Sequence, residues 1–261
     1  SEHATMHLLY ARFITKALRD IGHLDFNEPF KKLFHQGIIT KDGSKMSKSR
    51  GNTVSPDKFI ERYGSDTFRC YLMFTGPYDE GGDWNDKGIT GIQRFLNRFH
   101  HVCTLPNGDE KEENTRIIHK TIKAVSKDLE DLKFNTAISR MMECINDIYS
   151  SDTLSKSNKD IIIKLLSPFA PHLCEELWEA IGETQTVFNQ SWPEYNEKMM
   201  VDDSMTIAIQ VNGKLRGSIE VSIDTDKDDI LSQSKSLENV QKFTDGMNIV
   251  KEIYVPNKLV N

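Results

Sequence analysis

Residues 40–52 read Thr-Lys-Asp-Gly-Ser-Lys-Met-Ser-Lys-Ser-Arg-Gly-Asn. This stretch is too rich in Gly, Ser and Lys to form a core element, so it predicts an exposed loop. Lys45 and Lys48 stand three residues apart, with hydroxyl groups at Ser47 and Ser49. Ammonium groups are mobile point charges that can follow phosphate charge as it develops. The pattern indicates a polyphosphate-binding loop, and a merely solvated basic loop is the alternative.

The composition of the 261 residues is that of an ordinary globular protein, with 38% hydrophobic and 28% charged residues. No apolar run approaches the roughly 18 residues that a membrane helix needs. The N-terminus shows no secretory signal, so we expect a cytoplasmic protein. The chain begins without methionine, which favours a piece of a longer protein. Its four cysteines lack CxxC spacing, which favours buried thiols in a reducing compartment.

Charge is unevenly distributed along the chain, although the formal net charge is only -6. Residues 1–75 carry 12 Lys and Arg against 8 Asp and Glu. Residues 76–201 carry 14 against 21, and residues 202–261 carry 7 against 10. The basic excess therefore surrounds the loop, where an anionic ligand is expected. The acidic remainder argues against indiscriminate binding of nucleic acid.

Apolar residues at helical spacing predict helices through most of the chain. Gly76 and Pro77 end the first group, and residues 78–84 read as a connector between domains. Pro168 and Pro171 kink or split the last helix, which gives a bundle of four or five helices. The predicted helices cover residues 4–21, 55–63, 65–74, 88–103, 113–133, 135–150 and 158–181.

The last part of the chain changes from helical to alternating periodicity. Residues 206–211 alternate as a strand, and Asn212-Gly213 is a strong hairpin turn before a return strand over 215–223. A helix over about 226–236, a polar link and a strand over 249–255 complete a small α+β domain.

The loop carries a resemblance to a known family. Residues 45–49, followed by Gly51-Asn52, Pro56 and Tyr63-Gly64-Ser65-Asp66-Thr67, resemble the second signature, KMSKS, of class I aminoacyl-tRNA synthetases. In that family the loop closes over ATP while an amino acid attacks the α-phosphate. The resemblance implies that Lys48 stabilises the leaving pyrophosphate and that Lys45 assists. It also implies that Lys45, Met46, Ser47, Lys48 and Ser49 bind ATP with its Mg²⁺, with backbone groups of Met46 and Ser47 near the adenine.

The N-terminal string points to one amino acid within that class. Ser1-Glu2-His3-Ala4-Thr5-Met6-His7-Leu8-Leu9-Tyr10-Ala11-Arg12-Phe13 resembles a segment of bacterial-type leucyl-tRNA synthetases. The resemblance implies that Glu2 bonds the ribose of ATP and that His3 and His7 line the leucine pocket. Histidines at i and i+4 can share Zn²⁺, but Ala4 stands where a zincin has Glu and no further ligand completes the set, so we expect no metal. A structural role at the helix start is the other alternative for both histidines.

Further matches to these enzymes lie after the loop, along the rest of the chain. Residues 83–98 and 167–178 resemble the entry and a late helix pair of their anticodon-binding helical domain. Core spacing in 167–178 favours packing, and His172 is expected to make a local hydrogen bond. Residues 210–217 resemble the hairpin of their small C-terminal domain. Lys214 and Arg216, on one side of that strand, are candidates for tRNA phosphate contacts, with a solvated hairpin tip as the alternative.

Taken together, the resemblance implies a mainly α protein with three domains. Residues 1–77 would be the end of a Rossmann-like catalytic domain with the KMSKS loop, 78–201 an anticodon-binding-type bundle and 202–261 a small α+β domain that contacts tRNA. The implied function is a leucine–tRNA ligase, with ATP, leucine and tRNA(Leu) as partners, no membrane and a monomeric state. The family's His-Ile-Gly-His signature and editing domain are absent from these residues, so the fragment alone is expected to be inactive. A non-catalytic tRNA-binding helical module is the alternative function.

Overall fold

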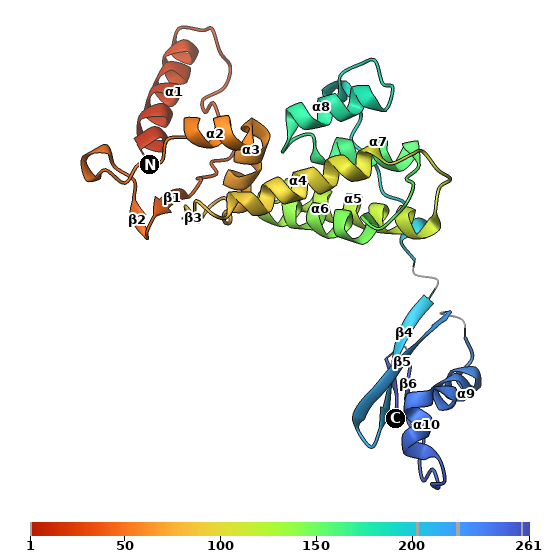
Figure 1. Cartoon of the computed structure of the whole chain (residues 1–261). Coiled ribbons are helices and arrows are strands. Elements are labelled where there is room, and N and C mark those ends of the chain that lie inside the picture. Colours follow the sequence, from red (N-terminus) through yellow and green to blue (C-terminus); the bar gives the residue numbers. More distant parts are fainter. Residues whose placement is uncertain (1, 202–203, 223–224, 257) are drawn as a thin grey trace. The chain divides into compact units, whose positions relative to one another are not determined.

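The computed structural model describes residues 2–201, 204–222, 225–256 and 258–261. The chain forms two compact units, Ser1–Tyr195 and Asn196–Asn261. The described residues are mainly α-helical, which confirms the predicted class (Figure 1). The division into three domains, at residues 77/78 and 201/202, stays a prediction. In the described part of the chain, no helix has the length and apolar character to cross a membrane.

The first unit opens with a helix and a small sheet. Strand β1 pairs antiparallel with β2 and parallel with β3, so the sheet order is β2-β1-β3. The stretch predicted as a connector, residues 78–84, contains the strand β3 at Gly81–Asp83. Gly81 is required where β3 pairs with β1, because a Cβ there would lie 2.3 Å from the carbonyl oxygen of Ile38. The elements are α1 (Glu2–Asp20), β1 (Ile38–Lys41), β2 (Ser44–Lys45), η1 (Lys48–Arg50), α2 (Asp57–Tyr63), α3 (Ser65–Phe74) and β3 (Gly81–Asp83).

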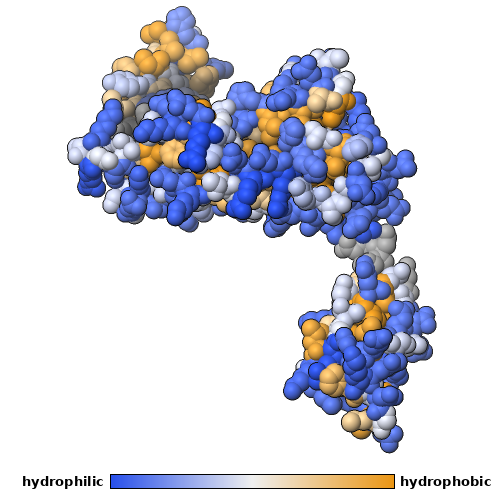
Figure 2. Space-filling view, in the orientation of Figure 1, coloured by the Kyte–Doolittle hydropathy of each residue, from blue (hydrophilic) through white to orange (hydrophobic). Residues whose placement is uncertain are grey.

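Helix α1 forms where the sequence predicts it, but its apolar stripe stays exposed. The side chains of Leu9, Phe13 and Ile21 are 63%, 65% and 68% exposed. Figure 2 shows hydrophobic surface, in orange, in the region of α1. Helical periodicity therefore predicted the element correctly, and its apolar face is exposed within the described part of the chain.

Five helices of the bundle enclose the main hydrophobic core of this unit. The break at Pro168 and Pro171 confirms the predicted split, with Pro171 in the first turn of the last helix. All four cysteines are free and buried. Burial raises the pKa of the Cys70 thiol to about 12 and that of Cys144 to about 11, so these thiols stay protonated. The helices are α4 (Ile89–Thr104), α5 (Glu112–Glu130), α6 (Phe134–Ile148), α7 (Lys156–Leu166) and α8 (Pro171–Ala180).

A buried carboxylate joins α3 to the start of α8. Asp66 accepts a hydrogen bond from the backbone N–H of Leu173 at 2.7 Å, and its other oxygen lies 2.8 Å from Nδ1 of His172. Arg69, one turn further along α3, donates to the carbonyl oxygen of Pro168 at 3.1 Å. The expectation of a local hydrogen bond at His172 was therefore wrong, since its partner lies 106 positions earlier in the chain. The first turn of α8 needs an acceptor for its free N–H groups, and α3 supplies it.

The second unit is a four-stranded sheet with two helices, in strand order β5-β4-β7-β6. Asn212 and Gly213 have φ of 53° and 75°, which a two-residue hairpin turn requires, so the predicted turn is confirmed. The prediction of a polar link after residue 236 was wrong, because that stretch contains the helix α10. Of the strand predicted over 249–255, only the last two residues form a strand, β6. Residue 223 of the predicted return strand lies outside the described residues. The elements are β4 (Ser204–Val211), β5 (Lys214–Ser222), α9 (Lys227–Ser236), α10 (Glu238–Thr244), β6 (Tyr254–Val255) and β7 (Leu259–Val260).

The contact between α3 and α8 gives a testable stability difference. Asp66→Ala leaves the Leu173 N–H without its acceptor, so we expect the first unit to lose about 1–3 kcal/mol. His172→Ala removes a solvent-facing partner whose side chain is 77% exposed, so it should cost well under half as much. All three tryptophans lie in the first unit, so urea unfolding followed by tryptophan fluorescence reports on that unit alone. Equal losses for the two variants would contradict the assigned role of Asp66.

Candidate functional site

A two-residue turn presents the first lysine of the predicted phosphate loop. Strands β1 and β2 pair through Thr40–Lys45 and Lys41–Ser44. Asp42 and Gly43 connect them with φ of 53° and 68°, the left-handed values that Asp-Gly favours in tight hairpins. The hairpin therefore ends at Lys45, where the loop begins.

The side chain of Asn52 closes the loop from its far end. Its Oδ1 accepts from the backbone N–H of Ser47 at 2.8 Å, and its Nδ2 donates to the carbonyl oxygen of Lys45 at 3.2 Å. Between Ser47 and Asn52 lies the short 3₁₀ turn η1, which is followed by Gly51 with φ of 67°. Asn52 belongs to the quoted signature but not to the predicted site residues. It holds both ends of residues 45–52 in one conformation.

Within the loop, the lysines face solvent and the methionine faces the protein. Lys45, Lys48 and Ser49 are exposed, whereas Met46 is partly buried against the core of the first unit. In the described part of the chain, neither Lys45 nor Lys48 forms a salt bridge, so both charges are available to an anion. Ser47 already uses its N–H for Asn52 and its carbonyl oxygen for Arg50, while its hydroxyl lies 2.8 Å from that of Ser49.

Strand β3 holds the hairpin from its other side through Asp83. Oδ1 of this residue accepts from the Thr40 hydroxyl at 2.5 Å and from the Gly43 N–H at 2.9 Å. These hydrogen bonds lower the pKa of the Asp83 carboxyl, and the one from the Thr40 hydroxyl has the largest effect. The group is therefore ionised at neutral pH. Sequence reasoning used Asp83 only as part of a family match, because nothing in the local pattern relates residue 83 to residue 40.

The predicted leucine-pocket residues lie on α1 and are only partly described. The side chains of Glu2 and His3 lie outside the described residues. His7 is exposed, and its ring centroid lies 5.8 Å from that of Phe30. No hydrogen bond or ion pair joins His7 to the loop among the described residues. In those residues no group of three metal-ligating side chains occurs either, and the absence of a structural metal stays a prediction.

An ion cluster ties the segment after α1 back onto that helix. Glu28 receives two hydrogen bonds from the Arg12 guanidinium, both 2.8 Å, and lies 3.1 Å from Nζ of Lys16. These two partners lower the pKa of the Glu28 carboxyl to about 2, and Arg12 has the larger effect. The planar fork of Arg12 gives the contact a defined geometry in spite of its exposure.

In the second unit, the predicted tRNA contacts have different surroundings. Lys214 is exposed. Ile209 pairs with Gly217 and Gln210 with Leu215, so Arg216 is the extra residue of a β-bulge in β5. Its guanidinium lies 3.6 Å from the ring centroid of Phe243 on α10, and its Nε is buried without a hydrogen-bond partner in the described part of the chain.

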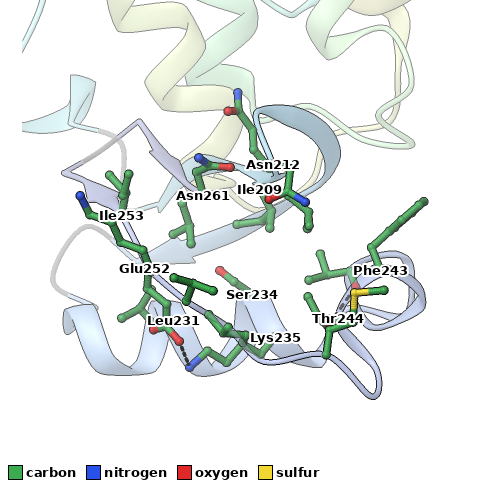
Figure 3. Close-up of a pocket in the computed structure, with 18 of the residues that line it drawn as sticks. Ile209, Asn212, Leu231, Ser234, Lys235, Phe243, Thr244, Glu252, Ile253 and Asn261 are labelled. Atoms are coloured by element: carbon green, nitrogen blue, oxygen red, sulfur yellow. Dashed lines mark hydrogen bonds and ion pairs between the residues drawn. The ribbon is translucent and has the colours of Figure 1, made fainter.

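A cavity of about 330 Å³ lies between the sheet and helices of this unit. Figure 3 shows Ile209 and Asn261 on the sheet side, with Lys235 and Thr244 on the helix side. Lys235 forms a 2.6 Å ion pair with Glu252 across the lower part of the view. Lys235 is neutralised by this pair, and Lys251 is the other basic residue of the described lining, which is mostly apolar, so the cavity does not have the cation cluster expected of a phosphate site.

Two family models match separate parts of the chain. The family model described as "tRNA synthetases class I (I, L, M and V)" matches residues 11–84, which contain the loop and Asp83. The model described as "Anticodon-binding domain of tRNA ligase" matches residues 115–231, which contain Lys214 and Arg216.

Curated relatives match the chain from end to end. A leucine–tRNA ligase of Caldanaerobacter subterraneus is 47% identical over 283 aligned residues, covering 100% of this chain and 35% of the relative. One from Clostridium tetani is 46% identical over 283 residues, with 100% and 35% coverage. The chain thus spans about a third of the length of the curated relatives it matches.

A solved structure shares the fold of the chain. It is the LeuRS of Agrobacterium radiobacter K84, in a ternary complex with tRNA and LeuAMS. The TM-score is 0.68 at 33% sequence identity, and the match covers 100% of this chain and 37% of that one.

The closure of the loop by Asn52 can be measured directly. Asn52→Ala removes the acceptor of the Ser47 N–H, so hydrogen exchange of the Ser47 amide, followed by NMR, should become about tenfold faster. Asn52→Asp keeps an acceptor at the same position and serves as the control, with slow exchange preserved. Unchanged exchange in Asn52→Ala would show that another group protects this amide.

The ion cluster of Glu28 predicts a pH dependence with a definite sign. The pKa of this carboxyl is lower in the folded chain than its ordinary value of 4.5, so the stabilisation is complete above pH 4.5. It is lost as the pH falls through about 2, when Glu28 becomes protonated. An NMR titration of the Glu28 carboxyl carbon checks the midpoint, which Arg12→Gln should move upward toward 4.5. A midpoint near 4.5 in the unaltered chain would rule the cluster out.

Proposed function

Because the chain belongs to the leucine–tRNA ligase family, among the class I tRNA synthetases, we propose that it forms the C-terminal part of an enzyme that activates leucine with ATP and transfers it to tRNA(Leu). The observation that carries the proposal is the loop itself. Lys45 and Lys48 are exposed and unpaired within the described residues, on a segment that Asn52 holds closed.

In the first reaction, the carboxylate of leucine attacks the α-phosphorus of ATP. A bond forms between the carboxylate oxygen and the phosphorus, and the bond to the bridging oxygen of pyrophosphate breaks, giving leucyl-adenylate. Negative charge grows on the leaving pyrophosphate, where Lys48 stabilises it and Lys45 assists. Mg²⁺ enters with ATP as the partner of its phosphates. A hydroxyl of the tRNA terminal ribose then attacks the carbonyl carbon, and AMP leaves.

The remaining loop residues orient ATP rather than neutralise it. Ser49 offers a hydroxyl to the phosphates, and Met46 and Ser47 lie beside the adenine. Because the N–H of Ser47 donates to Asn52, backbone recognition of adenine falls mainly to Met46. Met46 is also the residue whose side chain packs on the protein, which keeps that backbone in place.

Helix α1 supplies the leucine side of the same site. Glu2 bonds the ribose, while His3 and His7 border the leucine and adenylate. The exposed apolar stripe of α1 supports this placement, because a face that holds Leu9, Phe13 and Ile21 is suited to packing against further protein. That protein would be the remainder of the catalytic domain, in keeping with relatives about three times as long as this chain.

The helical bundle and the second unit contact tRNA in this proposal. Lys214 is exposed and contributes a phosphate contact as a point charge. Arg216 presents a guanidinium whose position is set by Phe243, so its contact is geometrically restricted. A cytoplasmic location and a monomeric state belong to the same proposal.

A variant in the complete ligase tests the catalytic role. Lys48→Ala should lower kcat for leucine-dependent ATP–pyrophosphate exchange about 100-fold, because a charge stabilising the transition state is lost. Lys58→Ala is the matched control, an exposed lysine on α2 that has no partner in the described part of the chain. A change within twofold for Lys48→Ala would refute the charge role.

The same assay separates the ligase from a non-catalytic tRNA-binding module. The 261 residues alone should show no exchange, since they hold only part of the active site. If Lys48→Ala leaves exchange intact while tRNA binding at two salt concentrations depends on Lys214, the chain acts as a binding module.

A further inference from the structure

We propose that Asp83 is a positioning residue for the loop over residues 45–52, acting through Thr40 and the turn at Asp42 and Gly43. The inference rests on the proposed function and adds to it a residue that none of the predicted site assignments contains. Asp83 does not touch the loop itself. It holds the β1–β2 hairpin, whose last residue is Lys45.

Strand register places the three residues concerned in one row. Thr40 pairs with Lys45 on one side and with Asp83 on the other. Directly paired residues point to the same face of a sheet, and neighbouring strands are about 4.8 Å apart. The side chain of Lys45 therefore lies on the same face of the sheet as the side chain of Asp83. Only β1, which carries Thr40, separates the two residues.

The hairpin is too short to hold this geometry alone. Its two strands share only two pairs, Thr40–Lys45 and Lys41–Ser44. An isolated two-stranded hairpin is at best marginally stable in water. Two hydrogen bonds to an ionised carboxylate, from the Thr40 hydroxyl and the Gly43 N–H, are therefore a large part of what fixes the turn.

The strand that carries Asp83 is itself immobilised by its neighbour. Trp84 is buried, with its ring centroid 4.8 Å from that of Phe59 and 5.0 Å from that of Tyr71. Its backbone N–H donates to the carbonyl oxygen of Thr40 at 2.8 Å. The carboxylate thus projects from a segment anchored in the core, and the turn is held against a rigid support.

Exposure separates this role from a contribution to folding. Asp83 is exposed, and its described side-chain partners are Thr40 and the turn. Removing it leaves the core around Trp84 and the helices of the bundle unaltered. The expected effect is therefore on where Lys45 and Lys48 lie when ATP is bound, with little effect on the unfolding of the first unit.

The test uses ATP–pyrophosphate exchange by the complete ligase. Asp83→Ala should lower kcat/KM for ATP about tenfold, corresponding to one strong hydrogen bond, while KM for leucine stays within twofold. Asp83→Asn keeps an oxygen acceptor for both donors and should retain activity within threefold. Thr40→Val removes one donor, so combined with Asp83→Ala it should cause no loss beyond that of Asp83→Ala alone.

Glu80→Ala is the matched control, an exposed carboxylate three residues earlier that has no side-chain partner in the described part of the chain. Exchange of the Gly43 amide reports the turn independently of activity and should be faster in Asp83→Ala. Activity of Asp83→Ala within twofold, or equal losses in Asp83→Asn and Asp83→Ala, would overturn the inference. If Lys48→Ala also left the exchange activity unchanged, the proposed function would fail as well. The two failures are therefore distinguishable, because loss of activity in Lys48→Ala together with an unaffected Asp83→Ala contradicts only the role of Asp83.

Discussion

The burial of Trp84 is the constraint on which the first unit depends. Its ring packs against Phe59, Tyr71 and Phe68, which lie on the two helices that follow the loop. Its backbone N–H closes the pairing of β1 with β3. Aromatic burial is among the largest single contributions a core residue makes, so the position of the short sheet follows from it. Five residues later, at Ile89, α4 and the bundle begin.

The loop divides its residues between anchoring and chemistry. Met46 packs on the protein, Asn52 closes the ends, and the lysines remain solvated. A solvated lysine without a partner costs little in the absence of ligand, and its attraction to phosphate is gained only when water is displaced. Separating these tasks lets the loop keep a defined backbone while its charges stay free. A salt bridge within the protein would have to be broken before the lysine could bind phosphate, which would reduce the free energy gained on binding.

The second unit shows how a single extra residue changes the environment of a side chain. Regular alternation would place Arg216 on the face opposite Gly217 and Ile219, away from the helices. The β-bulge puts Arg216 beside Gly217 instead, and its guanidinium stacks on Phe243. The sequence predicted the hairpin correctly, but the bulge has no signature in the pattern of residues 210–217. The missed helix α10 carries the aromatic partner, so both errors concern the same contact.

Local sequence determined most of the secondary structure and the chemical character of the loop. Helical periodicity, the prolines around the start of α8 and the Asn212-Gly213 turn act over a few residues, so they can be read without the fold. The Lys45–Ser49 signature and its charge are likewise local. Tertiary structure alone decided which groups meet: Asp83 with Thr40, Asp66 with His172, and Arg216 with Phe243. These partners are 43, 106 and 27 positions apart, and a hydrogen bond or ring contact over such separations forms only after packing has brought the segments together.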